Sequence, residues 1–175
     1  MGKVSIGLQG WRFEESAVFT DEGDYRPFDE MDADTRRRLV RLSVIVGAPC
    51  GACWLAYDDR ERQREAEYVY GEPLAEVLLC AAHEPDFVYW FREAGGDEHA
   101  GVDDFDDRFH EWYLDGGRAP DGYEGMEYVD EGDALPEPPT PDPETVPELQ
   151  DHLGRATAGE RIDLRDGTVE PLDDA

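Results

Sequence analysis

The stretch GAPCGACWL, residues 47–55, decides the fold because it carries Cys50 and Cys53, two of the three cysteines in the chain. The third cysteine, Cys80, is followed by His83 in the stretch LLCAAH, residues 78–83. Together they form the pattern C-x2-C-x26-C-x2-H. Structural zinc takes four tetrahedral ligands, and three thiolates with one imidazole are a common set. The spacing therefore predicts a Zn2+ ion held by Cys50, Cys53, Cys80 and His83.

Two other interpretations of the cysteines remain open. A thioredoxin-like redox pair needs only two thiols after a parallel-sheet unit, but Pro49 precedes this pair and the second pair would have no role. Buried, inert thiols are the simplest alternative. Iron would fit the same ligands, although zinc is the usual occupant. Four protein ligands close a zinc site to water, so the pattern favours a structural metal over a catalytic one.

The residues around the two ligand pairs predict a small α+β unit. Residues 54–57 and 74–79 are expected to form two strands, joined through the charged stretch DDRERQRE at 58–65. A helix is expected from His83 to Ala94, with Pro85 tolerated in its first turn. Gly47 and Gly51 are expected to give the first ligand pair a permissive backbone.

This order of elements resembles the treble-clef zinc finger. The stretch PCGAC resembles its knuckle, residues 54–57 and 74–79 its hairpin, and CAAHEPDFVYWF, residues 80–91, the start of its helix. The resemblance covers residues 48–93 and implies a metal-dependent fold. It implies no single function, because one fold hosts many roles.

The charge of the chain is extreme. Its 175 residues include 44 acidic and 16 basic residues, giving a net charge of −28, and Lys3 is the only lysine. This composition resembles that of cytoplasmic proteins of salt-loving archaea, and with the cysteine pattern it resembles a haloarchaeal zinc-finger protein. At about 1 M salt the Debye length is roughly 3 Å, so dense like charge repels little. The charge is thus interpreted first as adaptation to solvent.

The remaining pattern predicts one α+β domain, a linker and a tail. Residues 1–116 are expected to form a small antiparallel sheet with packed helices, including a strand at 3–8 and helices at about 34–46 and 103–117. Residues 117–147 read as an acidic, Pro-rich linker. Residues 148–175 are expected to form a short helix and a hairpin around Asp166 and Gly167.

One window departs from the acidic composition. Between residues 36 and 64, seven arginines face three acids, a net charge of +4. Such a cluster beside a zinc knuckle predicts phosphate contacts or binding to an acidic protein. Pairing with surrounding carboxylates is the simpler interpretation and the favoured one, and high salt weakens nucleic-acid binding. The candidate binding residues are Arg36, Arg37, Arg38, Arg41, Arg60, Arg62 and Arg64.

The leading functional hypothesis is a non-catalytic structural-zinc protein that acts as an interaction or regulatory module in a halophilic cytoplasm. Its expected partner is another protein, and a nucleic-acid-binding zinc finger is the alternative. The chain has no nucleophile elbow, phosphate loop or metalloprotease helix, and residues 54–79 contain no histidine for a nuclease metal. No leader or membrane-spanning run is seen. A second metal site near His99 and His110 is a weaker possibility than solvated helix-terminal charge.

Overall fold

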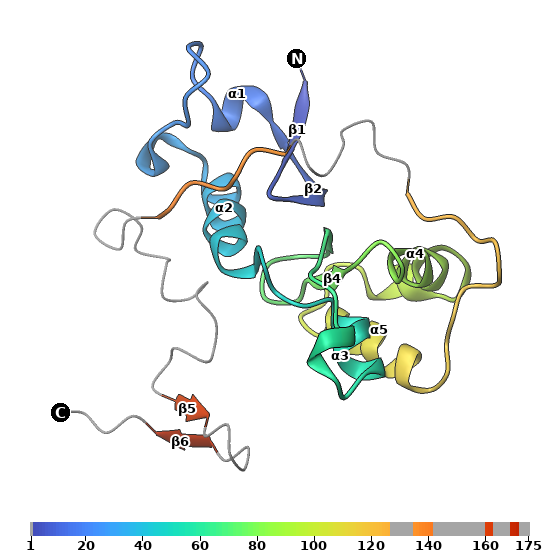
Figure 1. Cartoon of the computed structure of the whole chain (residues 1–175). Coiled ribbons are helices and arrows are strands. Elements are labelled where there is room, and N and C mark those ends of the chain that lie inside the picture. Colours follow the sequence, from blue (N-terminus) through green and yellow to red (C-terminus); the bar gives the residue numbers. More distant parts are fainter. Residues whose placement is uncertain (1, 127–134, 142–159, 163–168, 172–175) are drawn as a thin grey trace.

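The computed structural model of the chain describes residues 2–126, 135–141, 160–162 and 169–171. Two lobes make up the main body (Figure 1). The first contains the N-terminal strands and α2, and the second contains α3, α4 and α5 around the cysteines. The α+β class is confirmed.

The N-terminal lobe begins with a hairpin. Strand β1 (Lys3–Ile6) pairs antiparallel with β2 (Leu8–Glu14). Gly7, between them, has a φ of +68°, a backbone conformation that favours glycine. The sequence predicted only one strand here, at 3–8. Residues 11–14 alternate between buried and exposed side chains, and β2 buries Leu8, Trp11 and Phe13.

Helices cover this hairpin. A short helix α1 (Glu15–Val18) follows β2, and the 3-10 turn η1 (Phe28–Glu30) leads to α2 (Ala33–Ile45). The Asp32 carboxylate caps α2 by accepting a hydrogen bond from the Thr35 amide at 2.9 Å. The predicted helix is thus confirmed, with Asp32 as its cap. Its apolar side packs on the hairpin through Leu39, Leu42 and Ile45.

The metal lobe differs from the prediction at its first strand. Residues 54–57 were expected to be extended, but helix α3 spans Gly51–Ala56, so that prediction is wrong. The Cys50 sulfur accepts a hydrogen bond from the Cys53 amide, and the Tyr57 amide bonds to the Cys53 carbonyl. These local bonds begin and close the helix, and they override the strand propensity of its aromatic and apolar side chains.

The hairpin of this lobe lies later in the chain. After the 3-10 turn η2 (Arg60–Arg62), strand β3 (Tyr68–Tyr70) pairs antiparallel with β4 (Val77–Leu79). Helix α4 (Glu84–Glu93), the turn η3 (Gly96–His99) and helix α5 (Phe105–Leu114) follow. The predicted helices after Cys80 are thereby confirmed, and Phe87, Trp90, Phe105 and Phe109 form their shared core.

The two lobes share one sheet. Its strand order is β1-β2-β3-β4, and β2 meets β3 in parallel at Gln9 and Tyr68. The sheet is therefore two antiparallel pairs joined by a parallel contact, whereas the sequence predicted an antiparallel sheet throughout. Val69 of β3 is fully buried and belongs to the core of the N-terminal lobe.

The C-terminal part is described in pieces. Strands β5 (Glu160–Ile162) and β6 (Val169–Pro171) pair antiparallel, as a hairpin requires, while Asp166, Gly167 and the predicted tail helix lie outside the described residues. Within the predicted linker, the Pro136 carbonyl accepts a hydrogen bond from the Gly7 amide at 2.8 Å. Residues 135–141 thus touch the N-terminal lobe, and the domain boundaries stay a prediction. None of the described helices is both long enough and apolar enough to span a bilayer.

Candidate metal centre

The four predicted ligands come from two turns at the ends of secondary structure. Cys50 is the N-terminal cap of α3 and Cys53 lies in its first turn. Cys80 follows β4, and His83 is the residue that caps α4. The Cys50 amide donates to the Arg64 carbonyl at 2.8 Å, and the His83 amide donates to the Cys80 carbonyl at 3.1 Å. Backbone bonds therefore fix both turns before any ion is considered.

The ligand atoms are spaced as a tetrahedral zinc site requires. The His83 Nδ1 atom lies 3.6 Å from the Cys50 sulfur and 3.4 Å from the sulfurs of Cys53 and Cys80. The Cys53 and Cys80 sulfurs are 3.8 Å apart. Zn–S bonds of about 2.3 Å and a Zn–N bond of about 2.0 Å, at tetrahedral angles, place two sulfurs about 3.8 Å apart and sulfur and nitrogen about 3.5 Å apart. The sequence-predicted set is brought together.

The chemistry of this cluster also fits a cation. All three cysteines are free and buried, and His83 is half-buried. A hydrogen bond from Cys50, helped by contacts from His83, outweighs the opposing effect of burial and lowers the pKa of Cys80 to about 3. The same Cys50–Cys80 bond, together with burial, raises the pKa of Cys50. Without a cation the two sulfurs compete for a proton, whereas a divalent ion would stabilise both as thiolates.

Aromatic rings and a small cavity border the ligands. The His83 ring meets Tyr113 edge to face, with centroids 5.8 Å apart. A cavity of about 330 Å³ reaches Cys53, Cys80 and His83. Its outer wall includes Tyr57, Arg62 and Arg64. The four ligands would complete the coordination, and this cavity is the side from which solvent approaches the site.

The two glycines of the first turn serve different purposes. Gly47 has a φ of +89° with open space around it, as the permissive-backbone expectation requires. Gly51 is needed for lack of space, because a Cβ atom at this position would stand 2.8 Å from the His110 Nε2 atom. The backbone explanation is therefore wrong for Gly51. The sequence could not reveal this, since His110 is 59 positions away.

A second group of possible metal ligands includes His110, one of the two histidines considered for a second metal site. Possible ligand atoms of Asp106, Asp107 and His110 lie within 4.8 Å of one another on α5. Both carboxylates belong to one helical turn and Asp107 is exposed, as expected for solvated helix charge. His99 is elsewhere, stacked on Trp90 with a centroid distance of 6.2 Å.

The four candidate arginines on α2 are engaged with the N-terminal lobe and the β3–β4 turn. Arg38 pairs with Asp34 at 3.2 Å and with Glu72 at 2.9 Å. Arg41 binds the buried Glu76 at 2.6 Å, and Arg37 lies 3.9 Å from Glu72. Arg36 donates to the Phe28 and Met31 carbonyls. Pairing with carboxylates, the simpler interpretation, describes Arg37, Arg38 and Arg41.

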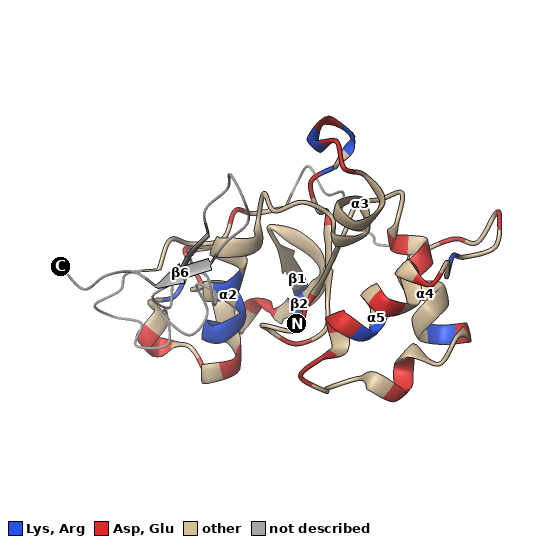
Figure 2. Cartoon of the chain, turned by 90° about the horizontal axis from the view of Figure 1, so that it is seen from below, with Lys and Arg blue, Asp and Glu red and all other residues tan. Residues whose placement is uncertain are grey.

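The three arginines around η2 are placed differently. Figure 2 shows the basic residues of α2 well apart from the loop that projects beside α3. Within residues 2–126 and 135–141, no ion pair involves Arg60, Arg62 or Arg64. Arg62 instead lies over the Tyr57 ring, 4.2 Å from its centroid. The predicted arginine face is thus divided in two.

Trp54 joins the second group and was missed by the sequence reasoning. Its side chain is 57 % exposed, although it lies on the helix that carries Cys53. It borders a shallow cavity of about 360 Å³ together with Arg60 and Arg64. The misassigned strand concealed it, because helical spacing from the buried Ala52 and Cys53 would have placed it outward.

Comparison with known proteins gives a family and no function. The model described as "Family of unknown function (DUF8114)" matches residues 1–175. No curated protein and no solved structure matches the chain.

Proposed function

We propose that this chain, which belongs to the family of unknown function DUF8114, is a non-catalytic structural-zinc protein that acts as an interaction or regulatory module. The single observation that carries the proposal is the clustering of the four ligand atoms, which all lie within 4.8 Å of one another, with His83 Nδ1 at 3.4–3.6 Å from the three sulfurs. Four protein ligands at tetrahedral spacing fill the coordination of zinc and leave no position for a catalytic water.

The arrangement around the ligands supports a treble-clef-like unit. A first turn carries Cys50 and Cys53, the hairpin β3–β4 follows, and α4 begins directly after Cys80 and His83. The first ligand turn opens helix α3, and the rest of α3 and the turn η2 precede the hairpin. The zinc would link the start of α3 to the start of α4.

The proposed working environment is a halophilic cytoplasm. Its support is the net charge of −28 with a single lysine. Such a surface repels itself in dilute buffer and is screened in molar salt. All measurements below are accordingly set in about 2 M KCl, where the Debye length is only a few ångströms.

Metal stoichiometry tests the proposal. Protein purified in molar KCl is expected to hold one zinc per chain, and Co2+ in its place should give the intense visible bands of a tetrahedral thiolate complex. His83→Gln should lose the metal, while the matched control His99→Gln should retain it. Less than half a zinc per chain, or equal metal content in both variants, would contradict the proposal.

A second candidate, single-stranded nucleic-acid binding, is favoured by the surface beside α3. Exposed Trp54 offers a ring on which a base can stack, and Arg60, Arg62 and Arg64 can contact phosphates. The four acids among residues 58–65 and the high salt both oppose it.

Crosslinking to RNA and DNA in molar KCl separates the two candidates. If this surface binds nucleic acid, Trp54→Ala and Arg62→Glu should each abolish the crosslink, and Arg37→Glu on α2 should leave it intact. Absence of any crosslink, or equal loss in all three variants, would remove the second candidate and leave the first untouched.

A further inference from the structure

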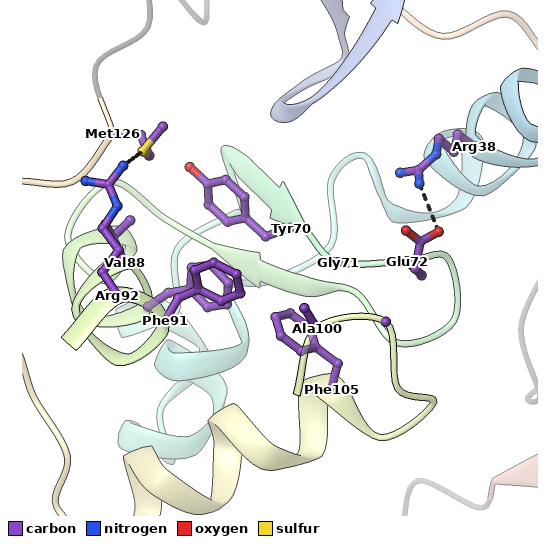
Figure 3. Close-up of a pocket in the computed structure, with 12 residues that line it drawn as sticks. Arg38, Tyr70, Gly71, Glu72, Val88, Phe91, Arg92, Ala100, Phe105 and Met126 are labelled. Atoms are coloured by element: carbon purple, nitrogen blue, oxygen red, sulfur yellow. Dashed lines mark hydrogen bonds and ion pairs between the residues drawn. The ribbon is translucent and has the colours of Figure 1, made fainter. Parts of the chain in front are cut away.

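A second concave site lies away from the cysteines, between β3, α4 and α5. It is a cavity of about 390 Å³, within the range of small-molecule pockets, which begins at roughly 300 Å³. Its wall is mainly apolar and includes four aromatic rings, and Figure 3 shows rings facing a common space between the strand and the two helices. The wall rings belong to Tyr70, Phe87, Phe91 and Phe105.

Charged groups stand at both ends of the ring wall. On one side, Arg38 donates to Glu72 at 2.9 Å and to Asp34 at 3.2 Å, so its charge is matched by carboxylates. On the other side, the Arg92 guanidinium lies beside the Met126 sulfur at 2.8 Å. Figure 3 shows Arg92 and Met126 together, across the aromatic rings from Arg38 and Glu72.

Arg92 has hydrogen-bonding capacity that the described residues leave unused. A guanidinium carries five N–H donors, whereas a thioether sulfur is a weak acceptor. Among residues 2–126 and 135–141, no carboxylate pairs with Arg92. The buried Glu84 carboxylate is nearby, but its Oε1 atom already accepts bonds from the Tyr70 hydroxyl at 2.7 Å and the Met126 amide at 3.0 Å.

We propose that this pocket binds a small carboxylic acid with a ring-sized apolar body. The body would lie against Phe91, Phe105 and Tyr70, where burial of apolar surface supplies the affinity. The carboxylate would face Arg92, whose planar fork matches two carboxylate oxygens. An amine of the same shape would meet the guanidinium with a like charge and be rejected.

The pocket shares no residue with the four metal ligands, so ligand binding there does not depend on which ion the cysteines hold. One link joins them, because Glu84, which holds Tyr70 and Met126, follows His83 directly. The experiment therefore uses the full chain with its metal retained.

Three fluorinated probes of one shape test the proposal by ¹⁹F NMR titration. They are 4-fluorophenylacetate, 2-(4-fluorophenyl)ethanol and 2-(4-fluorophenyl)ethylamine, which share a two-carbon side chain. The carboxylate is expected to bind roughly two- to fivefold more tightly than the alcohol, since an exposed ion pair contributes about that factor. The amine is expected to bind most weakly.

Variants assign the effect to Arg92. Arg92→Gln should weaken binding of the carboxylate to about the affinity of the alcohol and leave the alcohol unchanged, and Arg108→Gln on α5 should change neither. Phe91→Ala should weaken both probes. Because Arg92 is exposed, the Arg92→Gln protein is expected to have the same melting temperature as the wild type. The proposal would be overturned by equal affinity for the acid and the alcohol, or by an Arg92→Gln titration equal to that of the wild type. It would also be overturned if no probe bound.

Discussion

His110 lies directly against Gly51, so closely that a Cβ at residue 51 would stand 2.8 Å from its Nε2 atom. Gly51 opens α3 beside the ligand Cys50, and His110 comes from α5. The approach of these two helices therefore depends on a residue without a side chain at one position and on an imidazole at the other.

Gly51→Ala is expected to destabilise the protein by about 1–3 kcal/mol, because an extra methyl group in a filled space forces its neighbours apart. In a His110→Ala background the same substitution should cost much less, since the imidazole is gone. Denaturant unfolding of the four proteins in molar KCl measures this coupling. Gly47→Ala is the control, because its cost comes from φ and should be equal in both backgrounds. Equal costs at residue 51 would contradict the contact.

A pH dependence follows from the burial of the same imidazole. Burial lowers the pKa of His110, and Asp106 and Asp107 only partly oppose this. As the pH falls, His110 therefore binds a proton first in the unfolded chain, near the ordinary histidine pKa of about 6.5. Stability from the neutral ring is complete above that pH and is lost as the pH falls through the folded pKa. The slope is at most about 1.4 kcal/mol per pH unit.

Unfolding of wild type and His110→Gln between about pH 5.5 and 7.5 checks this sign, with zinc content measured at each point. The wild type should lose stability toward the acid end faster than the variant. Parallel curves would contradict the prediction.

Removal of the metal should loosen one lobe before the other. Structural zinc can contribute on the order of 10 kcal/mol, more than many domains have in total. After chelation, amide exchange should rise first in α3, β4 and α4, while β1, β2 and α2 keep their own core. Hydrogen exchange with mass spectrometry resolves the two. Equal loss of protection in both lobes would show that they unfold as one unit.

Arg41 and Arg62 are expected to behave oppositely, although both were candidates for the same surface. Arg41→Ala leaves Glu76, whose side chain is 5 % exposed, without its 2.6 Å partner. Breaking such a buried pair costs about 3 kcal/mol or more. Arg62→Ala removes an exposed stacking contact and should cost under about 1 kcal/mol. Chemical denaturation compares the two, and similar costs would contradict the division of the arginines.

Replacement of Leu74 by glycine is expected to leave the stability of the protein nearly unchanged. Its φ of 74° lies in the left-handed region, which costs a residue with a Cβ roughly 1–2 kcal/mol. Leu74→Gly relieves that strain while losing a side chain that is 43 % exposed, so the net change should be near zero. Val102 is 40 % exposed without a positive φ, and Val102→Gly should destabilise. Thermal melts of both variants test the contrast.

Much of the metal site was predictable because its signals are local. The spacing of Cys50, Cys53, Cys80 and His83 predicted the cluster, since a two-residue gap lets one turn present two ligands. The helices α2 and α5 were predicted equally well at about 34–46 and 103–117. Caps, spacing and periodicity depend on neighbours within a few positions, which the sequence displays directly.

Only the tertiary structure decided features that depend on distant partners. Strand β3 pairs with β4 on one side and meets β2 in parallel on the other. Glu72 and Glu76 engage arginines of α2, and this left the η2 arginines beside Trp54 as a separate surface. The aromatic pocket of Tyr70, Phe91 and Phe105 likewise forms only where three elements meet. Such contacts arise from packing between segments tens of residues apart, so composition and periodicity could predict the ligands but not their surroundings.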